Sequence, residues 1–349
     1  MSGAVATLIQ WMERGLVPDG VVRFGIRNLI RQRARSLSPS DCEAAGQMRR
    51  RFIESMYGAE VAPVPELANE QHYEVPAAFY ELVLGRHRKY SCCYWRGSPG
   101  ETLDTAEINS LRETCDHADL RDGQRVMELG CGWGSLSLWM AEHYPNSYFT
   151  VVSNSASQKE FIDHQARERL LTNLTVLTAD MNHFDIEQKF DRVVSVEMFE
   201  HMRNWPALFE RIHRWLNDDG KFFMHVFCHR AVPYKFEVQN DSDWMSRYFF
   251  SGGMMPSDDL ALHFQSSLQC EQQWRWGGCH YQKTALAWVA NMDRHRDEIL
   301  SLFSRVYGAG KEVQWFNRWR IFFWACAELF GYDNGQQWWV SHYRFNRHR

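Results

Sequence analysis

A glycine-rich loop is the first segment whose composition and spacing favour ligand chemistry. Gly130, Gly132 and Gly134 follow a short apolar run that contains Glu128, and they precede a helical pattern. Glycines let the backbone turn sharply and approach a ligand closely. The start of a helix offers free N–H groups that suit a carboxylate or a phosphate. The loop can serve a dinucleotide, but its spacing departs from the G-x-G-x-x-G pattern of those sites.

Two glutamates and a histidine form a second reactive segment, in the order E-x-x-E-H. They are Glu197, Glu200 and His201. Such side chains can accept a proton, and carboxylates favour a positive charge beside them. If the segment is a turn of helix, Glu197 and Glu200 share one face. The alternative is an exposed glutamate pair with a capping histidine and no chemistry.

Residues 120–230 must position both segments. Short apolar runs predict strands, and the stretches between them predict helices: strands at 125–129, 149–153, 174–180, 190–198 and 221–227, and helices at 135–144, 155–170 and 207–216. This alternation predicts an α/β fold with a parallel, doubly wound sheet and right-handed crossovers. Ligands of such sheets bind at the carboxyl ends of the strands. The glycine loop follows the first strand and E-x-x-E-H follows the fourth, so we expect both at that edge.

Composition limits the class of protein. The 349 residues are 45% hydrophobic, enough for a sizeable core, and the net charge of −4 disfavours a nucleic-acid partner. No apolar run reaches the roughly 18 residues of a membrane span, and the N-terminal segment lacks the basic region of a secretory signal. The nine cysteines contain no C-x-x-C pair, so neither a metal site nor a disulfide framework is expected. A reducing, cytoplasmic location is the simplest expectation.

The tight E-x-G-x-G-x-G form resembles the S-adenosylmethionine (SAM) loop of class I methyltransferases. Plant coclaurine-type N-methyltransferases, which share a superfamily with the cyclopropane fatty acid synthases, resemble this chain in an ordered set of motifs: YSCCYW, LDTAE, ELGCGWGSLSLWMAE, SNSASQKEFI, SVEMFEHMRNW, RYFFSGGMMPS and AELFGYDNG. The resemblance runs from about residue 10 to the end. It implies a Rossmann-like class I fold, SAM as cofactor and methylation of a benzylisoquinoline-like amine.

The resemblance also implies a cofactor site, which combines the loop with polar residues at the strand ends: Ser91, Gly130, Gly132, Asn154, Gln158, Asp180, Met181 and Val196. The amides of Asn154 and Gln158 can both donate and accept, so they can bind a ribose diol. Asp180 can accept from an adenine amino group, and Met181 can pack on the ring. Each residue taken alone is as compatible with a helix cap or a core position.

In the N-methyltransferases the E-x-x-E-H segment is catalytic. An alkylamine is mostly protonated at neutral pH and must lose its proton before it attacks the sulfonium methyl group. We hypothesise that Glu200 and His201 deprotonate and hold the amine, and that Glu197 adds negative charge that favours the product cation. The resemblance further places Tyr73 and Glu74 near the substrate.

The aromatic content offers walls for such a substrate. The chain has 15 Trp, 13 Tyr and 22 Phe, and aromatic faces attract cationic amines and stack on flat rings. Candidates for a cap over the substrate are Trp315, Trp319, Phe322, Phe323 and Tyr332. The alternative is that this helix simply buries an aromatic face in the core.

A lipid-modifying enzyme, which transfers a methyl group to an acyl double bond, is the main alternative. Those enzymes resemble the chain in KYSCCYW, in F-E-H and in His225. They usually carry Gly where Glu197 stands, and a tyrosine of their C-terminal helix is replaced here by Trp or Phe between 319 and 323. Cys326 aligns with a cysteine sometimes designated catalytic in them, but methyl transfer needs no thiolate and a buried structural role is favoured.

A degenerate, non-catalytic scaffold is a third reading, and the intact loop and E-x-x-E-H argue against it. We expect four segments: an N-terminal helical extension (1–65), a cap and cofactor-covering segment (66–119), the SAM-binding core (120–230), and a substrate cap that also completes the sheet (231–349). A small-molecule amine is the expected partner, and a homodimer is possible.

Overall fold

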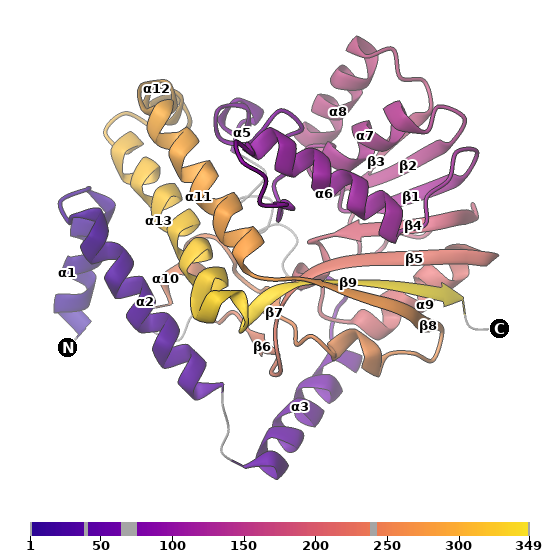
Figure 1. Cartoon of the computed structure of the whole chain (residues 1–349), viewed down its shortest axis with the longest axis horizontal. Helices are drawn as coiled ribbons and strands as arrows, with labels where there is room; N and C mark the ends of the chain where they lie inside the picture. Colours follow the sequence, from indigo (N-terminus) through magenta and orange to yellow (C-terminus); the bar gives the residue numbers. More distant parts are fainter. Residues whose placement is uncertain (1, 38–40, 64–74, 238–242, 348–349) are drawn as a thin grey trace.

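The computed structural model describes residues 2–37, 41–63, 75–237 and 243–347. Its centre is a seven-stranded sheet in the order β3-β2-β1-β4-β5-β9-β8 (Figure 1). The strands are β1 (Arg125–Leu129), β2 (Tyr148–Ser153), β3 (Leu174–Thr178), β4 (Phe190–Val196), β5 (Leu216–His229), β8 (Leu268–Trp276) and β9 (Trp338–Arg347). The five strands expected from the sequence are all present, and the doubly wound α/β fold is confirmed.

The sheet is mixed, which corrects the expectation of a wholly parallel one. β1 to β5 pair in parallel, whereas β9 pairs antiparallel with both β5 and β8. The reason lies in the connection between β8 and β9. The chain leaves β8 at the carboxyl edge of the sheet, forms three helices there, and re-enters at the same edge as β9, which must then run in the opposite direction.

Helices cover both faces of the sheet. α6 (Leu103–His117), α7 (Ser135–His143) and α8 (Ala156–Glu168) pack on one face, where Leu111, Leu138 and Ile162 join Val126 and Val151 of the strands. α9 (Trp205–Trp215) covers the other face, and α3 (Cys42–Tyr57) lies against it. α7, α8 and α9 begin within two residues of the positions expected from the sequence. The loops that join the strands to these helices therefore also lie where the sequence predicted them.

The remaining helices gather beyond the carboxyl edge of the sheet (Figure 1). They are α1 (Ser2–Glu13), α2 (Asp19–Ser36), α5 (Ala77–Val83), α10 (Trp244–Tyr248), α11 (Cys279–Arg294), α12 (Arg296–Tyr307) and α13 (Glu312–Gly331). α1 and α2 lie along α13, where Arg318 Nη2 donates to Glu13 Oε2 at 2.9 Å and Arg23 Nε donates to Glu328 Oε1 at 2.6 Å. These ion pairs, whose carboxylates are buried, join the N-terminal helices to the C-terminal third of the chain.

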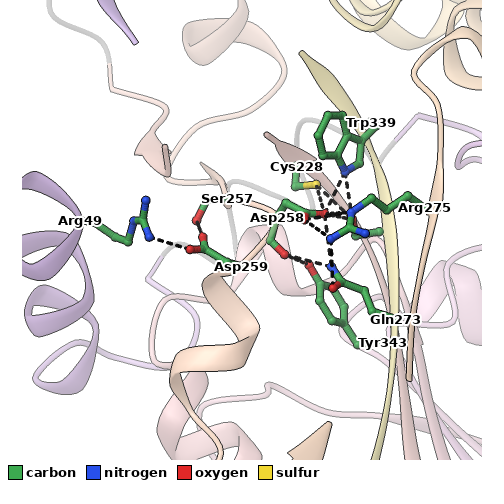
Figure 2. A network of polar contacts seen from close by, with 10 residues as sticks. Arg49, Cys228, Ser257, Asp258, Asp259, Gln273, Arg275, Trp339 and Tyr343 are labelled. Carbon is green, nitrogen blue, oxygen red and sulfur yellow. Dashed lines mark hydrogen bonds and ion pairs between the residues drawn. The ribbon is translucent and has the colours of Figure 1, made fainter. Parts of the chain in front are cut away.

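The turn that follows the short pair β6 (Tyr234–Lys235) and β7 (Met254–Met255) is anchored at two acidic residues (Figure 2). Asp258 accepts from Arg275 of β8 and from Trp339 Nε1 of β9, at 2.6 and 2.9 Å. Asp259 accepts from Arg49 of α3 at 2.7 Å. The turn at Asp258 and Asp259 is therefore fixed to β8 and β9 and to α3.

Within the described residues, no helix combines the length and the hydropathy that a bilayer crossing requires. All nine cysteines lie in the described part of the chain, and each is a free thiol.

Candidate active site

The glycine loop turns back under the end of β2. The backbone N–H groups of Gly130 and Cys131 both donate to Val152 O, at 3.0 and 3.1 Å. Gly130 has a φ of +77°, and a Cβ there would lie 2.8 Å from the Met198 side chain. Gly132 has a φ of +52°, but a Cβ there would meet open space. The loop therefore needs glycine at 130 for packing, and at 132 it keeps clear a space beside the backbone.

Two adjoining open cavities meet at this loop and share Gly130, Gly132 and Glu197 in their linings; with the solvent-filled space at their mouths included, they span about 740 and 620 Å³. The larger cavity is lined by Asn154, Gln158, Asp180 and Met181, and the smaller by Ser91, Val196 and Glu128. The structure thus brings together all eight residues of the expected cofactor site. Their individual roles stay predictions.

Several buried polar atoms beside the cavities have no partner among the described residues. Gln158 Oε1 accepts from Ser153 Oγ at 2.6 Å, but Gln158 Nε2 is buried without an acceptor. Ser135 Oγ, Thr114 Oγ1 and Trp133 Nε1, which belong to residues lining the smaller cavity, are likewise unpaired. Leaving a buried donor unpaired costs free energy, so these atoms suit a polar ligand that reaches both cavities.

The E-x-x-E-H segment follows β4 at the same edge. Its last three residues form a 3₁₀ turn, η2 (Phe199–His201). Glu197 precedes the turn with a φ of +48°, a left-handed conformation that is costly for a residue with a Cβ. Glu197 therefore lies outside the turn that holds Glu200, and the condition under which the two glutamates would share one helical face is not met. The strain is of the kind found at functional sites.

Glu197 is held by donors from three other parts of the chain. Its Oε1 accepts from Cys92 N at 2.9 Å and from His225 Nε2 of β5 at 3.1 Å. Its Oε2 accepts from the Tyr281 hydroxyl of α11 at 2.8 Å. Only 9% of the side chain is exposed, so the carboxylate is fixed in position where the two cavities meet.

The two glutamates hold protons differently. Burial would raise the pKa of Glu197, but the hydrogen bonds from His225 and Cys92, together with the charge of Lys89, hold it below its ordinary value. Burial, and then the charge of Glu197, raise the pKa of Glu200 well above its ordinary value. Glu200 Oε1 accepts from Phe227 N at 2.7 Å, and its Oε2 has no partner among the described residues. The pair therefore combines an anionic acceptor with a carboxyl group that binds a proton tightly.

His201 lines the larger cavity with Glu197 and stacks on Phe250 at 4.6 Å. Burial lowers the pKa of His201 to about 4, so its imidazole is neutral at physiological pH. Glu200 is fully buried. The alternative of a solvent-exposed glutamate pair with a capping histidine is therefore wrong.

Comparison with known proteins identifies the family. Residues 65–338 match the protein family described as "Mycolic acid cyclopropane synthetase". The (S)-coclaurine N-methyltransferase of Thalictrum flavum subsp. glaucum is 35% identical over 98% of this chain and 96% of its own length. A crystal structure of coclaurine N-methyltransferase bound to N-methylheliamine and SAH superposes with a TM-score of 0.95, at 33% identity over 98% of this chain and 99% of that one. The chain belongs to the coclaurine N-methyltransferase branch of the mycolic acid cyclopropane synthetase family.

Membership in the coclaurine N-methyltransferase branch makes the chain a SAM-dependent methyltransferase, and the resemblance seen in the sequence is confirmed. The lipid enzymes are more distant. The cyclopropane-fatty-acyl-phospholipid synthase of Escherichia coli (strain K12) is 29% identical over 68% of this chain and 59% of its own length. The third reading, a scaffold without enzymatic activity, is not supported.

Among the described residues, those expected to contact the substrate do not line the two cavities, in contrast to those expected to bind the cofactor. Tyr73 and Glu74 lie outside the described residues. Trp319 is fully buried and packs on Phe79, with 4.8 Å between ring centroids. Phe322 stacks on Phe249 at 4.3 Å and 7°. Both rings lie in the hydrophobic core, and a substrate contact for either stays a prediction.

The other aromatic candidates also have protein neighbours. Trp315 stacks on Tyr307 at 4.1 Å. Phe323 packs against Trp288, and Tyr332 against Trp338. Most of the aromatic excess in α13 is thus used for packing. Burial raises the pKa of Cys326 to about 12, so its thiol stays protonated at neutral pH and is unsuited to act as a base.

Sequence reasoning missed the partners of Glu197. Tyr281 lies in the region 231–349, where no strand could be located from the sequence, and therefore no site at the carboxyl end of one. Cys92 contributes its backbone N–H group, and the type of residue at a position does not show whether its backbone will serve a site. His225 carried a signal, because β5 was expected beside β4 and its histidine falls level with Val196 in the pairing register.

Proposed function

We propose that the chain transfers the methyl group of SAM to the nitrogen of an aromatic amine of the arylalkyl or benzylisoquinoline type. The observation that carries this proposal is the buried pair of Glu197 and Glu200 beside the glycine loop. Two buried carboxyl groups suit a substrate that enters as a cation and leaves as a cation. The N-methyltransferase names of the most similar relatives support the same reaction.

The cofactor fits the two cavities on chemical grounds. Asn154 and the unpaired Nε2 of Gln158 would hold the ribose, Asp180 and Met181 the adenine, and Ser91 would face the methionine portion. Glu128, whose Oε2 accepts from Ser137 Oγ at 2.5 Å, joins the end of β1 to α7 across the loop and would offer its carboxyl group to the ligand's ammonium. When bound, SAM supplies an electrophilic methyl group on a sulfonium centre.

The chain's own residues then prepare the amine. Glu197 attracts the incoming ammonium. The charge of this cation favours loss of the proton that Glu200 holds at rest, which leaves to solvent as the substrate enters. The Glu200 carboxylate then takes the proton of the ammonium, because burial gives the ionised group a high proton affinity. Neutral His201 accepts a hydrogen bond from the amine and directs its lone pair. The nitrogen forms a bond to the methyl carbon as the carbon–sulfur bond breaks, and the positive charge moves to nitrogen beside Glu197.

The remaining expectations belong to the same proposal. The helices beyond the sheet edge, α11 and α13 among them, form the wall of the substrate site. Nine free cysteines suit a reducing compartment, and we infer a cytoplasmic location. A homodimer remains part of the proposal as an arrangement to be measured in solution.

Methyl transfer from SAM labelled in its methyl group tests the proposal. Primary and secondary aromatic amines, including simple tetrahydroisoquinolines, are offered in parallel with vesicles of unsaturated phospholipid. We expect label in at least one amine and background counts in lipid. Label in lipid with none in any amine would refute the proposal.

A further inference from the structure

Three histidines extend from Glu197 in a continuous hydrogen-bonded chain. His225 Nε2 lies 3.1 Å from Glu197 Oε1. His342 Nε2 of β9 lies 2.9 Å from His225 Nδ1, and His117 Nδ1 of α6 lies 2.8 Å from His342 Nδ1. Each central imidazole therefore uses both ring nitrogens. We name this arrangement, Glu197–His225–His342–His117, the histidine chain.

The donors that surround Glu197 determine which nitrogen of each histidine carries the proton. A backbone N–H, from Cys92, and a hydroxyl, from Tyr281, donate to its two oxygens, a pattern that suits an ionised carboxylate. His225 must then donate from Nε2, and its Nδ1 becomes an acceptor. His342 consequently donates from Nε2 and accepts at Nδ1, so that His117 donates from Nδ1. With Glu197 ionised and the three rings neutral, this is the one assignment in which every contact of the histidine chain pairs a donor with an acceptor.

The rings are neutral because they are buried. Burial lowers the pKa of His225, lowers that of His342 well below its ordinary value, and lowers that of His117 to about 4. Further charged or titratable groups on neighbouring elements face the histidine chain: Lys89, Cys92, Glu113, Glu200, Tyr281, Cys326 and Arg344. Lys89 and Arg344 also disfavour a proton on the rings they face.

The fold holds the rings in place. His225 and His342 are opposite residues in the β5–β9 pairing. Trp276 packs against His342 with 4.2 Å between ring centroids, and Trp274 stacks on His117 at 4.0 Å and 9°. Rings packed in this way resist rotation. The same nitrogens therefore face each other at every contact of the histidine chain.

We propose that His342 and His117 are positioning residues that fix His225 as an Nε2–H donor to Glu197. Without them His225 can adopt the opposite tautomer, whose unprotonated Nε2 would face the carboxylate and repel it. The histidine chain thereby keeps Glu197 anionic and oriented beside the amine. The consequence for turnover rests on the proposed function, whereas the tautomer assignment does not.

Nitrogen NMR of the wild-type chain labelled with ¹⁵N-histidine tests the assignment directly. We expect His225 and His342 to be neutral and protonated at Nε2, and His117 to be protonated at Nδ1, across pH 6–8. His225 protonated at Nδ1 would overturn the proposal. This measurement needs no substrate, so its outcome is independent of whether the methyl acceptor has been identified correctly.

Two variants at one position test the catalytic consequence. His342→Phe removes the donor to His225, while His342→Gln places an amide N–H near the position of Nε2. We expect kcat for amine methylation to fall about ten- to a hundredfold in His342→Phe, the scale of one charge-assisted hydrogen bond. His342→Gln should recover most of this loss, with KM for SAM unchanged in both.

The pH profile separates positioning from simple support of the fold. When His225 changes tautomer in His342→Phe, Glu197 loses the Nε2–H of His225 as a donor, so the pKa of Glu197 rises. The carboxylate that attracts the ammonium is then lost at a higher pH, and the acid limb of kcat/KM moves to higher pH. His342→Gln should keep the wild-type limb. Equal losses in both variants with an unmoved acid limb would show that His342 supports packing alone and would overturn the proposal. A wild-type chain inactive on amines, with the NMR assignment intact, would instead count against the proposed function.

Discussion

Glu197 and Glu200 carry the same functional group but have opposite proton affinities, because their surroundings differ. Glu197 receives three hydrogen bonds, whereas Glu200 receives one and has a fully buried second oxygen. The segment's capacity for proton chemistry could be predicted from E-x-x-E-H. The division of labour could not, because it depends on donors that lie 28 to 105 residues away in the sequence.

Glu200→Gln is expected to lower kcat about 10²- to 10⁴-fold, the usual contribution of a general base. The amide keeps the acceptor for Phe227 N but cannot take the amine's proton. SAM affinity, measured by calorimetry, should stay within about twofold. Glu160→Gln on the exposed face of α8 is the matched control. A parallel loss of SAM binding would show that Glu200 is structural.

Glu128 predicts a pH-dependent stability of the cofactor-free protein. Burial raises the pKa of Glu128 to about 7, above its ordinary value of 4.5. The folded state then binds more protons than the unfolded state between these two values, so this residue's contribution to stability is lost as pH rises through that window. Glu128→Gln should flatten the fall of Tm with pH. Identical pH–Tm curves for variant and wild type would contradict the assignment.

At the scale of elements, the five parallel strands and their helices could be predicted because short apolar runs alternate with amphipathic stretches. β8 and β9 could not be located. β8 reads LQCEQQWRW, which lacks a continuous apolar run, and β9 pairs with β5, more than a hundred residues earlier in the chain. The aromatic pattern of α13 was ambiguous, since a packed face and a ligand-binding face look alike in sequence.

The glycine loop makes a prediction about affinity. A Cβ at Gly132 points into open space beside the cavities, and its φ of +52° is unfavourable for alanine. Gly132→Ala should weaken SAM binding at least tenfold, because the methyl group occupies the ligand's space. Gly97→Ala is the control, since Gly97 also has a positive φ, of +79°, with open space around it, but lies in an exposed loop. Equal SAM affinities in the two variants would contradict this role of the loop.

Trp319 tests whether α13 packs a core or contacts the substrate. The side chain is fully buried against Phe79 and Phe249, so Trp319→Ala should cost about 3–5 kcal/mol of the free energy of unfolding. Trp11→Ala, at an exposed position of α1, should cost less than about 0.5 kcal/mol. Denaturant titration measures both. A raised KM for the amine with unchanged stability would instead identify Trp319 as a substrate contact.

On the scale of the whole molecule, segments far apart in sequence meet at the carboxyl edge of the sheet. The glycine loop and E-x-x-E-H come from the core, Cys92 from the segment before it, and Tyr281 and His342 from the C-terminal third. The N-terminal helices α1 and α2 are joined to α13 rather than to the sheet (Figure 1). The cofactor edge could be predicted from the alternation of strands and helices, whereas the surroundings of the acceptor required the three-dimensional fold.

The most direct test of the account offers both acceptors to the enzyme at once. SAM carrying a ¹³C-methyl group is incubated with equimolar secondary aromatic amine and unsaturated phospholipid, and NMR locates the label. We predict that the label appears in a methyl group bonded to nitrogen, and that Glu200→Gln lowers the rate at which this signal grows at least about a hundredfold. Label in a cyclopropane ring or a branched acyl chain, with none on nitrogen, would contradict the account.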